Sequence, residues 1–164
     1  MGGGILPITI HKGIICLLLG QERSNQWADF GGTPNPNEST FNTAIREGGE
    51  ELNGFLGSGS YLKRKVNDNF IKKVVTEDIN KSYTSYLFYI DYDENLEIYF
   101  NNNNKFNEKY LQDKINIRHN GLFEKKRIKW FKISELKINL RPFYYDIIKQ
   151  IIKDKKEIER LIKK

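Results

Sequence analysis

The chain has 164 residues, of which 38% are hydrophobic, 13% aromatic and 29% charged, and its formal net charge is +6. This length and composition fit one globular domain with a buried core and exclude a disordered chain. A single cysteine, Cys16, excludes a disulfide framework and a cysteine-rich zinc site, and it favours a reducing, cytoplasmic location.

Two strands are predicted at the start of the chain. Residues 5–10 and 13–19 are rich in Ile and Leu, and the second run is almost continuously apolar, as in strands buried on both faces. His11-Lys12-Gly13 between them predicts a tight turn. The run from Ile14 to Leu19 is far too short to cross a bilayer, so we expect no membrane partner.

A loop and a helix between residues 31 and 54 organise the rest of the chain. Residues 31–38 are rich in Gly and Pro, which predicts a loop, and Ser39 is suited to cap the helix that follows. Asn53-Gly54 predicts the end of that helix, because both residues tolerate the left-handed conformation.

Three carboxylates share one face of this helix. Glu47, Glu50 and Glu51 lie within about one turn, because positions three and four apart are neighbours on a helix. Their mutual repulsion is relieved by a divalent cation that prefers oxygen ligands, and Mg²⁺ is the usual ion where phosphates are handled. The alternative for such a run, taken alone, is a solvated acidic face.

The stretch from residue 32 to 54 resembles the Nudix box, G-x5-E-x7-R-E-U-x-E-E-x-G-U, in which U is a bulky apolar residue. Its charged and first glycine positions are all matched, by Gly32, Glu38, Arg46, Glu47, Glu50 and Glu51. Gly48, Asn53 and Gly54 depart from the pattern. None of the departures removes a charged residue, and close backbone packing would explain Gly48.

The resemblance implies an α/β fold, with a mixed β-sheet between α-helices, in a single domain spanning residues 1–164. It implies that Glu50 and Glu51 bind Mg²⁺ or Mn²⁺, and that Glu47 is a third ligand or the general base. A glycine carbonyl, from Gly31 or Gly32, joins the metal shell in this family. Arg46 is expected to orient the carboxylates, and Glu38 to reach either Arg46 or a metal-bound water.

The second half of the chain contains weaker signals. Residues 69–76, 83–92 and 126–131 are predicted as strands, and the run of four Asn at 101–104 as a surface loop. The segment from Trp130 to Leu136 resembles one found late in Nudix domains, where an acidic residue just before the tryptophan often binds metal. Lys129 occupies that position here. Glu124 is the nearest acidic candidate, and a surface ion pair is an equal alternative for it.

A basic helix is predicted for residues 142–164. Seven basic and three acidic residues between Lys149 and Lys164 carry four of the six net positive charges. Such a helix is usually a solvated amphipathic element, and the alternative is contact with RNA or another polyanion.

The box implies hydrolysis of a phosphoanhydride, and three functions are consistent with it. The first is a pyrophosphohydrolase acting on a small nucleoside diphosphate derivative. The second is an mRNA-decapping enzyme, because the residues of the box and the excess of Asn, Lys and Ile resemble Nudix proteins of large DNA viruses. The location of such an enzyme would be the host cytoplasm. The third, a binding module without activity, is disfavoured by the intact carboxylates.

Overall fold

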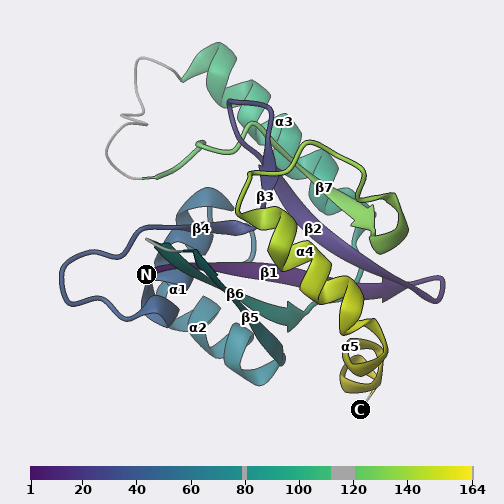
Figure 1. Cartoon of the computed structure of the whole chain (residues 1–164). Coiled ribbons are helices and arrows are strands. Elements are labelled where there is room, and N and C mark those ends of the chain that lie inside the picture. Colours follow the sequence, from purple (N-terminus) through teal and green to yellow (C-terminus); the bar gives the residue numbers. More distant parts are fainter. Residues whose placement is uncertain (79–80, 112–120, 164) are drawn as a thin grey trace.

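The computed structural model describes residues 1–78, 81–111 and 121–163, and Figure 1 shows the arrangement of their elements. The strands form one sheet of seven, and their bounds are β1 (Gly2–His11), β2 (Ile14–Gln21), β3 (Trp27–Ala28), β4 (Phe30–Gly32), β5 (Phe70–Asp78), β6 (Lys81–Tyr89) and β7 (Arg127–Lys132). The α-helices are α1 (Thr40–Glu51), α2 (Gly59–Asp68), α3 (Glu94–Tyr110), α4 (Tyr144–Lys153) and α5 (Lys155–Ile162).

The sheet is mixed. Its main order is β3-β2-β1-β6-β5, with β4 paired to β1 and β7 paired to β2. The β1–β6 pair is parallel, and the other pairs are antiparallel. Lys12 and Gly13 have φ of 50° and 76°, so the predicted tight turn between β1 and β2 is present.

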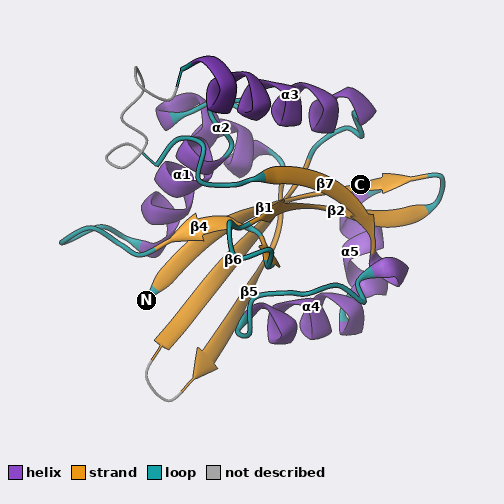
Figure 2. Ribbon diagram, turned by 90° about the horizontal axis from the view of Figure 1, so that it is seen from above, coloured by secondary structure: helices purple, strands orange, loops and turns teal. Residues whose placement is uncertain are grey.

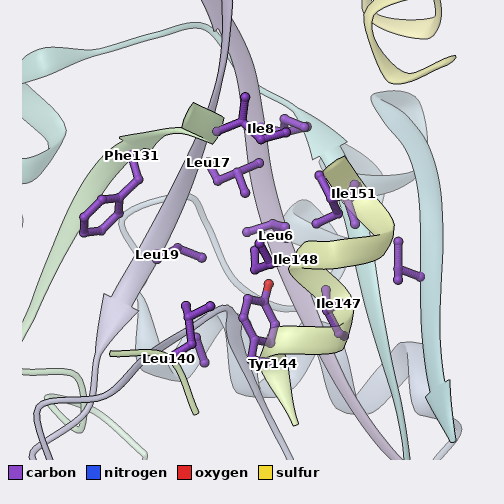
Figure 3. Close-up of a cluster of buried hydrophobic side chains, with 14 of the residues drawn as sticks. Leu6, Ile8, Leu17, Leu19, Phe131, Leu140, Tyr144, Ile147, Ile148 and Ile151 are labelled. Atoms are coloured by element: carbon purple, nitrogen blue, oxygen red, sulfur yellow. The ribbon is translucent and has the colours of Figure 1, made fainter. Parts of the chain in front are cut away.

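Helices cover both faces of the sheet, as Figure 2 shows with α1, α2 and α3 on one side and α4 and α5 on the other. Side chains of β2 alternate between the two resulting cores. Leu17 and Leu19 point to the α4 side, where Tyr144 is fully buried (Figure 3), whereas Cys16 and Leu18 point to the α1 side. The prediction of a doubly buried central strand is therefore confirmed, and so is the α/β class with a mixed sheet between helices.

Two helical features differ from the sequence predictions. The helix expected over 142–164 is two helices. Helix α4 ends at Lys153, and Asp154 caps it; the carboxylate of Asp154 accepts a hydrogen bond from Gln150 and pairs with Lys72 of β5. Lys164 lies outside the described residues. Helix α2 occupies a basic stretch for which no helix was predicted. No helix in the three described ranges is long and apolar enough to span a membrane.

The predicted loop at 101–104 is wrong, because these asparagines lie inside α3. Their amides bind the outer edge of β7 and the residues just before it: Asn101 accepts from the N–H of Ile128 at 3.1 Å and Asn104 donates to the carbonyl of Lys125 at 2.6 Å. Glu97 accepts the N–H of Trp130 in the same way. An edge strand needs such partners, so the polar run serves packing between a helix and a strand edge.

Candidate active site

Helix α1 begins and ends where its sequence predicts. The hydroxyl of Ser39 accepts the N–H of Asn42 at 3.2 Å, and Asn53 and Gly54 have φ of 51° and 73°. Gly48 faces the sheet, and a Cβ there would lie 2.4 Å from Ile5 Cδ1. The expected close packing at Gly48 is therefore confirmed.

Arg46 is the centre of a cluster of carboxylates on the solvent side of α1. Its Nε and Nη2 donate to the two oxygens of Glu38, each at 3.0 Å, and its Nη1 lies 2.9 Å from Glu47 Oε1 and 3.3 Å from Glu50 Oε2. Nη2 also donates to the carbonyl of Thr33 at 3.1 Å. One planar guanidinium thus fixes three carboxylates and the loop before the helix.

The hydrogen bonds from Arg46 lower the pKa of Glu38 to about 2, and the N–H of Asn35 adds to this effect. Glu50 behaves differently, because burial raises the pKa of its carboxyl and the charge of Arg46 opposes that rise. Glu38 is thus committed to Arg46 and the loop, whereas Glu47 and Glu50 lie beside each other at the guanidinium's other end.

The two glycines of β4 allow helix and strand to approach closely. A Cβ at Gly32 would lie 2.6 Å from Glu47 Oε1, so this carboxylate rests directly on the strand end. A Cβ at Gly31 would lie 2.3 Å from the Cα of Gly4 in β1. Neither glycine has room for a side chain, and the N–H of Gly31 donates to Glu51 at 2.8 Å.

Glu51 points away from this cluster into the protein. Its side chain is 5% exposed, and Oε1 lies 3.2 Å from Nζ of Lys125, whose own side chain is 1% exposed. The same ammonium lies 2.5 Å from Glu22 Oε1. Burial lowers the pKa of Lys125 and the two carboxylates raise it more, so the net effect keeps the ammonium charged.

Residues 121–125 close the site opposite α1. Gly121 has φ of 68°, and a Cβ there would lie 2.6 Å from Glu50 Oε2. Asn53 positions the segment, because its side chain accepts the N–H of Phe123 at 2.7 Å and donates to Asn104 at 2.9 Å. The exposed carboxyl of Glu124 has a raised pKa, through desolvation and then through the charge of Glu47. Glu124 therefore lies in the electrostatic field of the cluster.

A second buried carboxylate lies under the strand that carries the glycines. Asp29 is 1% exposed, and it accepts hydrogen bonds from the hydroxyls of Tyr83 at 2.7 Å and Ser85 at 2.6 Å. Burial raises its pKa to about 6. These bonds tie β6 to the start of β4, so Asp29 supports the position of Gly31.

Sequence reasoning missed Lys125, Asn53 and Asp29 as contributors to the site. Lys125 belongs to the basic run 125–127, which is typical of an exposed turn, and no sequence signal marks it as buried. Asn53 had a usable signal, since an Asn that replaces a left-handed Gly keeps the turn and adds an amide. Asp29 had no signal in the sequence beyond its place next to the Gly-Gly pair.

An open cavity of about 500 Å³ adjoins the Arg46 cluster. Arg46 and Glu50 form one wall, and Lys63 of α2 forms part of another, where it donates to Asn42 at 3.1 Å. Gly49 also faces this cavity, and a Cβ there would make only ordinary contact, 3.5 Å, with Ser58. The space is of the size that small-molecule sites use.

No three His, Cys, Asp or Glu residues in the described ranges converge as a ready-made metal site. Glu47 and Glu50 nevertheless fit a hard divalent cation, since both place an oxygen at the same nitrogen of Arg46. Mg²⁺ commonly binds one or two carboxylates together with the phosphates of its substrate. These two residues thus suffice for an ion that arrives with phosphate groups.

Comparison with known proteins gives similarity in structure only. No family model and no curated protein matches the sequence. An Ap4A hydrolase of C. elegans is 19% identical, with a TM-score of 0.54 over 93% of this chain and 94% of that one. A MutT protein of Methanosarcina mazei Go1 is 18% identical, with a TM-score of 0.50 over 94% of each chain. The chain has the Nudix fold.

A larger protein contains the same fold. A bifunctional NMN adenylyltransferase/ADP ribose pyrophosphatase of Francisella tularensis, solved with AMP and a Mn ion, is 18% identical, with a TM-score of 0.62. The match covers 93% of this chain but 41% of that protein, so the present chain corresponds to less than half of it. At these identities the shared feature is the Nudix fold itself.

Proposed function

We propose that the chain is a Nudix-type hydrolase that cleaves a phosphoanhydride bond in a nucleoside diphosphate linked to another group. The observation that carries the proposal is the Arg46 cluster. Glu47 and Glu50 are held side by side, over a glycine strand end and beside an open cavity. A fold alone does not specify chemistry, so the proposal rests on these side chains.

Each residue has a distinct role in this proposal. Glu47 and Glu50 hold the divalent ion, Mg²⁺ or Mn²⁺, which when bound supplies positive charge to the phosphates and lowers the pKa of its water. Arg46 sets the angle of both carboxylates, and Glu38 holds Arg46 from the other side. Glu47 is also the candidate general base, because its carboxylate lies directly on the strand end at Gly32.

The cavity offers room for the group attached to the diphosphate. Its polar lining includes Lys63 and Asn42, and Ile45 and Leu122 supply apolar surface. ADP-ribose and dinucleoside polyphosphates are the first candidates, because proteins of the same fold are named for Ap4A and ADP-ribose hydrolysis.

Capped RNA, the substrate of an mRNA-decapping enzyme of the viral type, is the second candidate, and the basic C-terminal helices are the feature that favours it. Ion pairs reduce this charge, because Lys149 pairs with Asp146 and Lys155 with Glu159. The net charge of +6 still favours a polyanion, so capped RNA belongs in the test.

The test is hydrolysis by the purified protein with Mg²⁺ or Mn²⁺. Substrates are ADP-ribose, dinucleoside polyphosphates, nucleotide sugars, oxidised nucleotides, diphosphoinositol phosphates and capped RNA. Glu47→Gln and Glu50→Gln serve as matched controls that keep the shape of the site. We expect metal-dependent turnover of at least one phosphoanhydride, with a loss of about a hundredfold or more in each variant. No turnover of any substrate, or equal turnover by the variants, contradicts the proposal.

A further inference from the structure

The buried ion cluster around Lys125 has no role in the chemistry proposed above. Lys125 Nζ lies 2.5 Å from Glu22 Oε1 and 3.2 Å from Glu51 Oε1. The other oxygen of Glu51 accepts the N–H of Gly31 at 2.8 Å. Both oxygens of this carboxylate therefore have partners within the chain, unlike a carboxylate that awaits a cation.

Contacts along the whole residue fix the position of the ammonium. The stem of Lys125 packs on β2, where a Cβ at Gly20 would lie 2.9 Å from its Cδ. Its carbonyl accepts the amide of Asn104 at 2.6 Å, which ties its backbone to α3. At the far end, Arg141 lies 3.5 Å from Glu22 and adds a second positive charge to that carboxylate.

We propose that Lys125 is a positioning residue that serves as the permanent cation of Glu51, so that Glu51 is not a ligand of the divalent ion. Of the carboxylates of α1, only Glu47 and Glu50 are then available to that ion. This inference rests on the proposed function, because it specifies which carboxylates of that site bind the ion. It differs from the expectation drawn from the box, in which Glu51 is a ligand.

The physical reason is the difference between buried and accessible cations. A divalent ion that reached Glu51 would have to displace an ammonium whose side chain is 1% exposed, and a displaced ammonium in that position loses a partner without gaining water. Arg46 is 28% exposed, and it keeps its two bonds to Glu38 when Glu47 and Glu50 turn to another cation. An ion therefore competes with Arg46 far more easily than with Lys125.

The first experiment titrates Mn²⁺ into the parent, Glu50→Gln and Glu51→Gln, with free Mn²⁺ followed by electron paramagnetic resonance. We expect Glu50→Gln to weaken binding about tenfold or more, and Glu51→Gln to change it less than about threefold. Equal weakening by the two variants overturns the inference and leaves the proposed function standing. A parent that binds no Mn²⁺ contradicts both.

The second experiment looks for a gained site. Lys125→Met removes the internal cation and leaves Glu22 and Glu51 facing each other. We expect the variant to bind one Mn²⁺ more than the parent. We also expect Mn²⁺ to raise the Tm of the variant by more than it raises the Tm of the parent. Glu51→Gln combined with Lys125→Met is the matched control, and it should not gain this response.

A purely structural lysine would not create a response to Mn²⁺. An unchanged number of bound ions and an unchanged shift in Lys125→Met therefore overturn the inference. If Lys125→Met does not fold, the comparison of Glu50→Gln with Glu51→Gln decides alone, because Glu51→Gln keeps the ion pair between Lys125 and Glu22.

Discussion

Arg46 and Lys125 each hold several carboxylates at the same end of the sheet, but in opposite environments. The side chain of Arg46 is 28% exposed and binds Glu38, Glu47 and Glu50, whereas that of Lys125 is 1% exposed and binds Glu22 and Glu51. Water can replace a lost partner at Arg46 and cannot do so at Lys125. The exposure of the cationic side chain, more than the identity of the carboxylate, therefore decides whether a carboxylate can exchange that side chain for a metal ion.

The largest expected effect on stability is at Lys125. Lys125→Met should lower the free energy of unfolding by about 3–5 kcal/mol, because it leaves the buried carboxylate of Glu51 without its cation. Arg46→Met should lower it by less, since the side chain of Arg46 is itself 28% exposed and water can take its place. Urea unfolding of the two variants measures this difference, and equal losses would remove the distinction between the two cations.

The same contrast between a buried and an open side applies within α1. Gly48→Ala should destabilise by about 1–3 kcal/mol, because its Cβ would meet Ile5 at 2.4 Å. A Cβ at Gly49 would make only ordinary contacts, the nearest at 3.5 Å, so Gly49→Ala should stabilise the helix by about 1 kcal/mol. Thermal unfolding of this neighbouring pair gives shifts of opposite sign if the two faces are assigned correctly.

Arg46→Lys tests whether the exposed cation, Arg46, positions carboxylates for catalysis. Lysine keeps the charge but loses the planar fork that reaches Glu38, Glu47 and Glu50 together. We expect kcat to fall about tenfold with little change in KM, since Arg46 positions carboxylates and does not bind substrate. A higher KM at unchanged kcat would instead make Arg46 a substrate ligand.

The smallest effect concerns pH. Arg46 lowers the pKa of Glu38 from its ordinary 4.5 to about 2, so the unfolded chain binds more protons than the folded one between these values. The stability that this bond contributes is complete above about pH 4.5 and is lost as the pH falls towards about 2. Between these pH values, the free energy of unfolding of Glu38→Gln should depend less on pH than that of the parent. Identical pH profiles would show that Arg46 does not hold Glu38 in solution.

The sequence predicted the exposed half of the site and missed the buried half. Helical spacing predicted Glu47, Glu50 and Glu51 on one face; the structure keeps Glu47 and Glu50 together at Arg46 but turns Glu51 into the protein. The caps of α1 were predictable, because they are local features that a few residues determine. Lys125 reaches Glu51 only because β7 pairs with β2 and Asn53 holds the preceding turn, and such long-range contacts leave no local pattern. The asparagines of α3 were misassigned for the same reason, since their partners are 21 and 27 residues away.

The same limit applies to the fold. The almost continuous apolar run at residues 13–19 identified β2 as buried on both faces, because such a run is read from adjacent residues. The break between α4 and α5 depends on Lys72, which lies in a distant strand and pairs with Asp154 and Glu157. A continuous apolar stripe therefore predicted one helix where tertiary contacts produce two.

The rates of Glu50→Gln and Glu51→Gln at saturating Mn²⁺, measured side by side on one hydrolysed phosphoanhydride, test the central claim most directly. Both variants replace a carboxylate of the same turn of α1 with an amide, and the two carboxylates differ in their burial and in the cation that they face. We predict a loss of about a hundredfold or more for Glu50→Gln and of no more than about tenfold for Glu51→Gln. Equal losses, or a larger loss for Glu51→Gln, would contradict the assignment of the exposed cluster to chemistry and the buried one to structure.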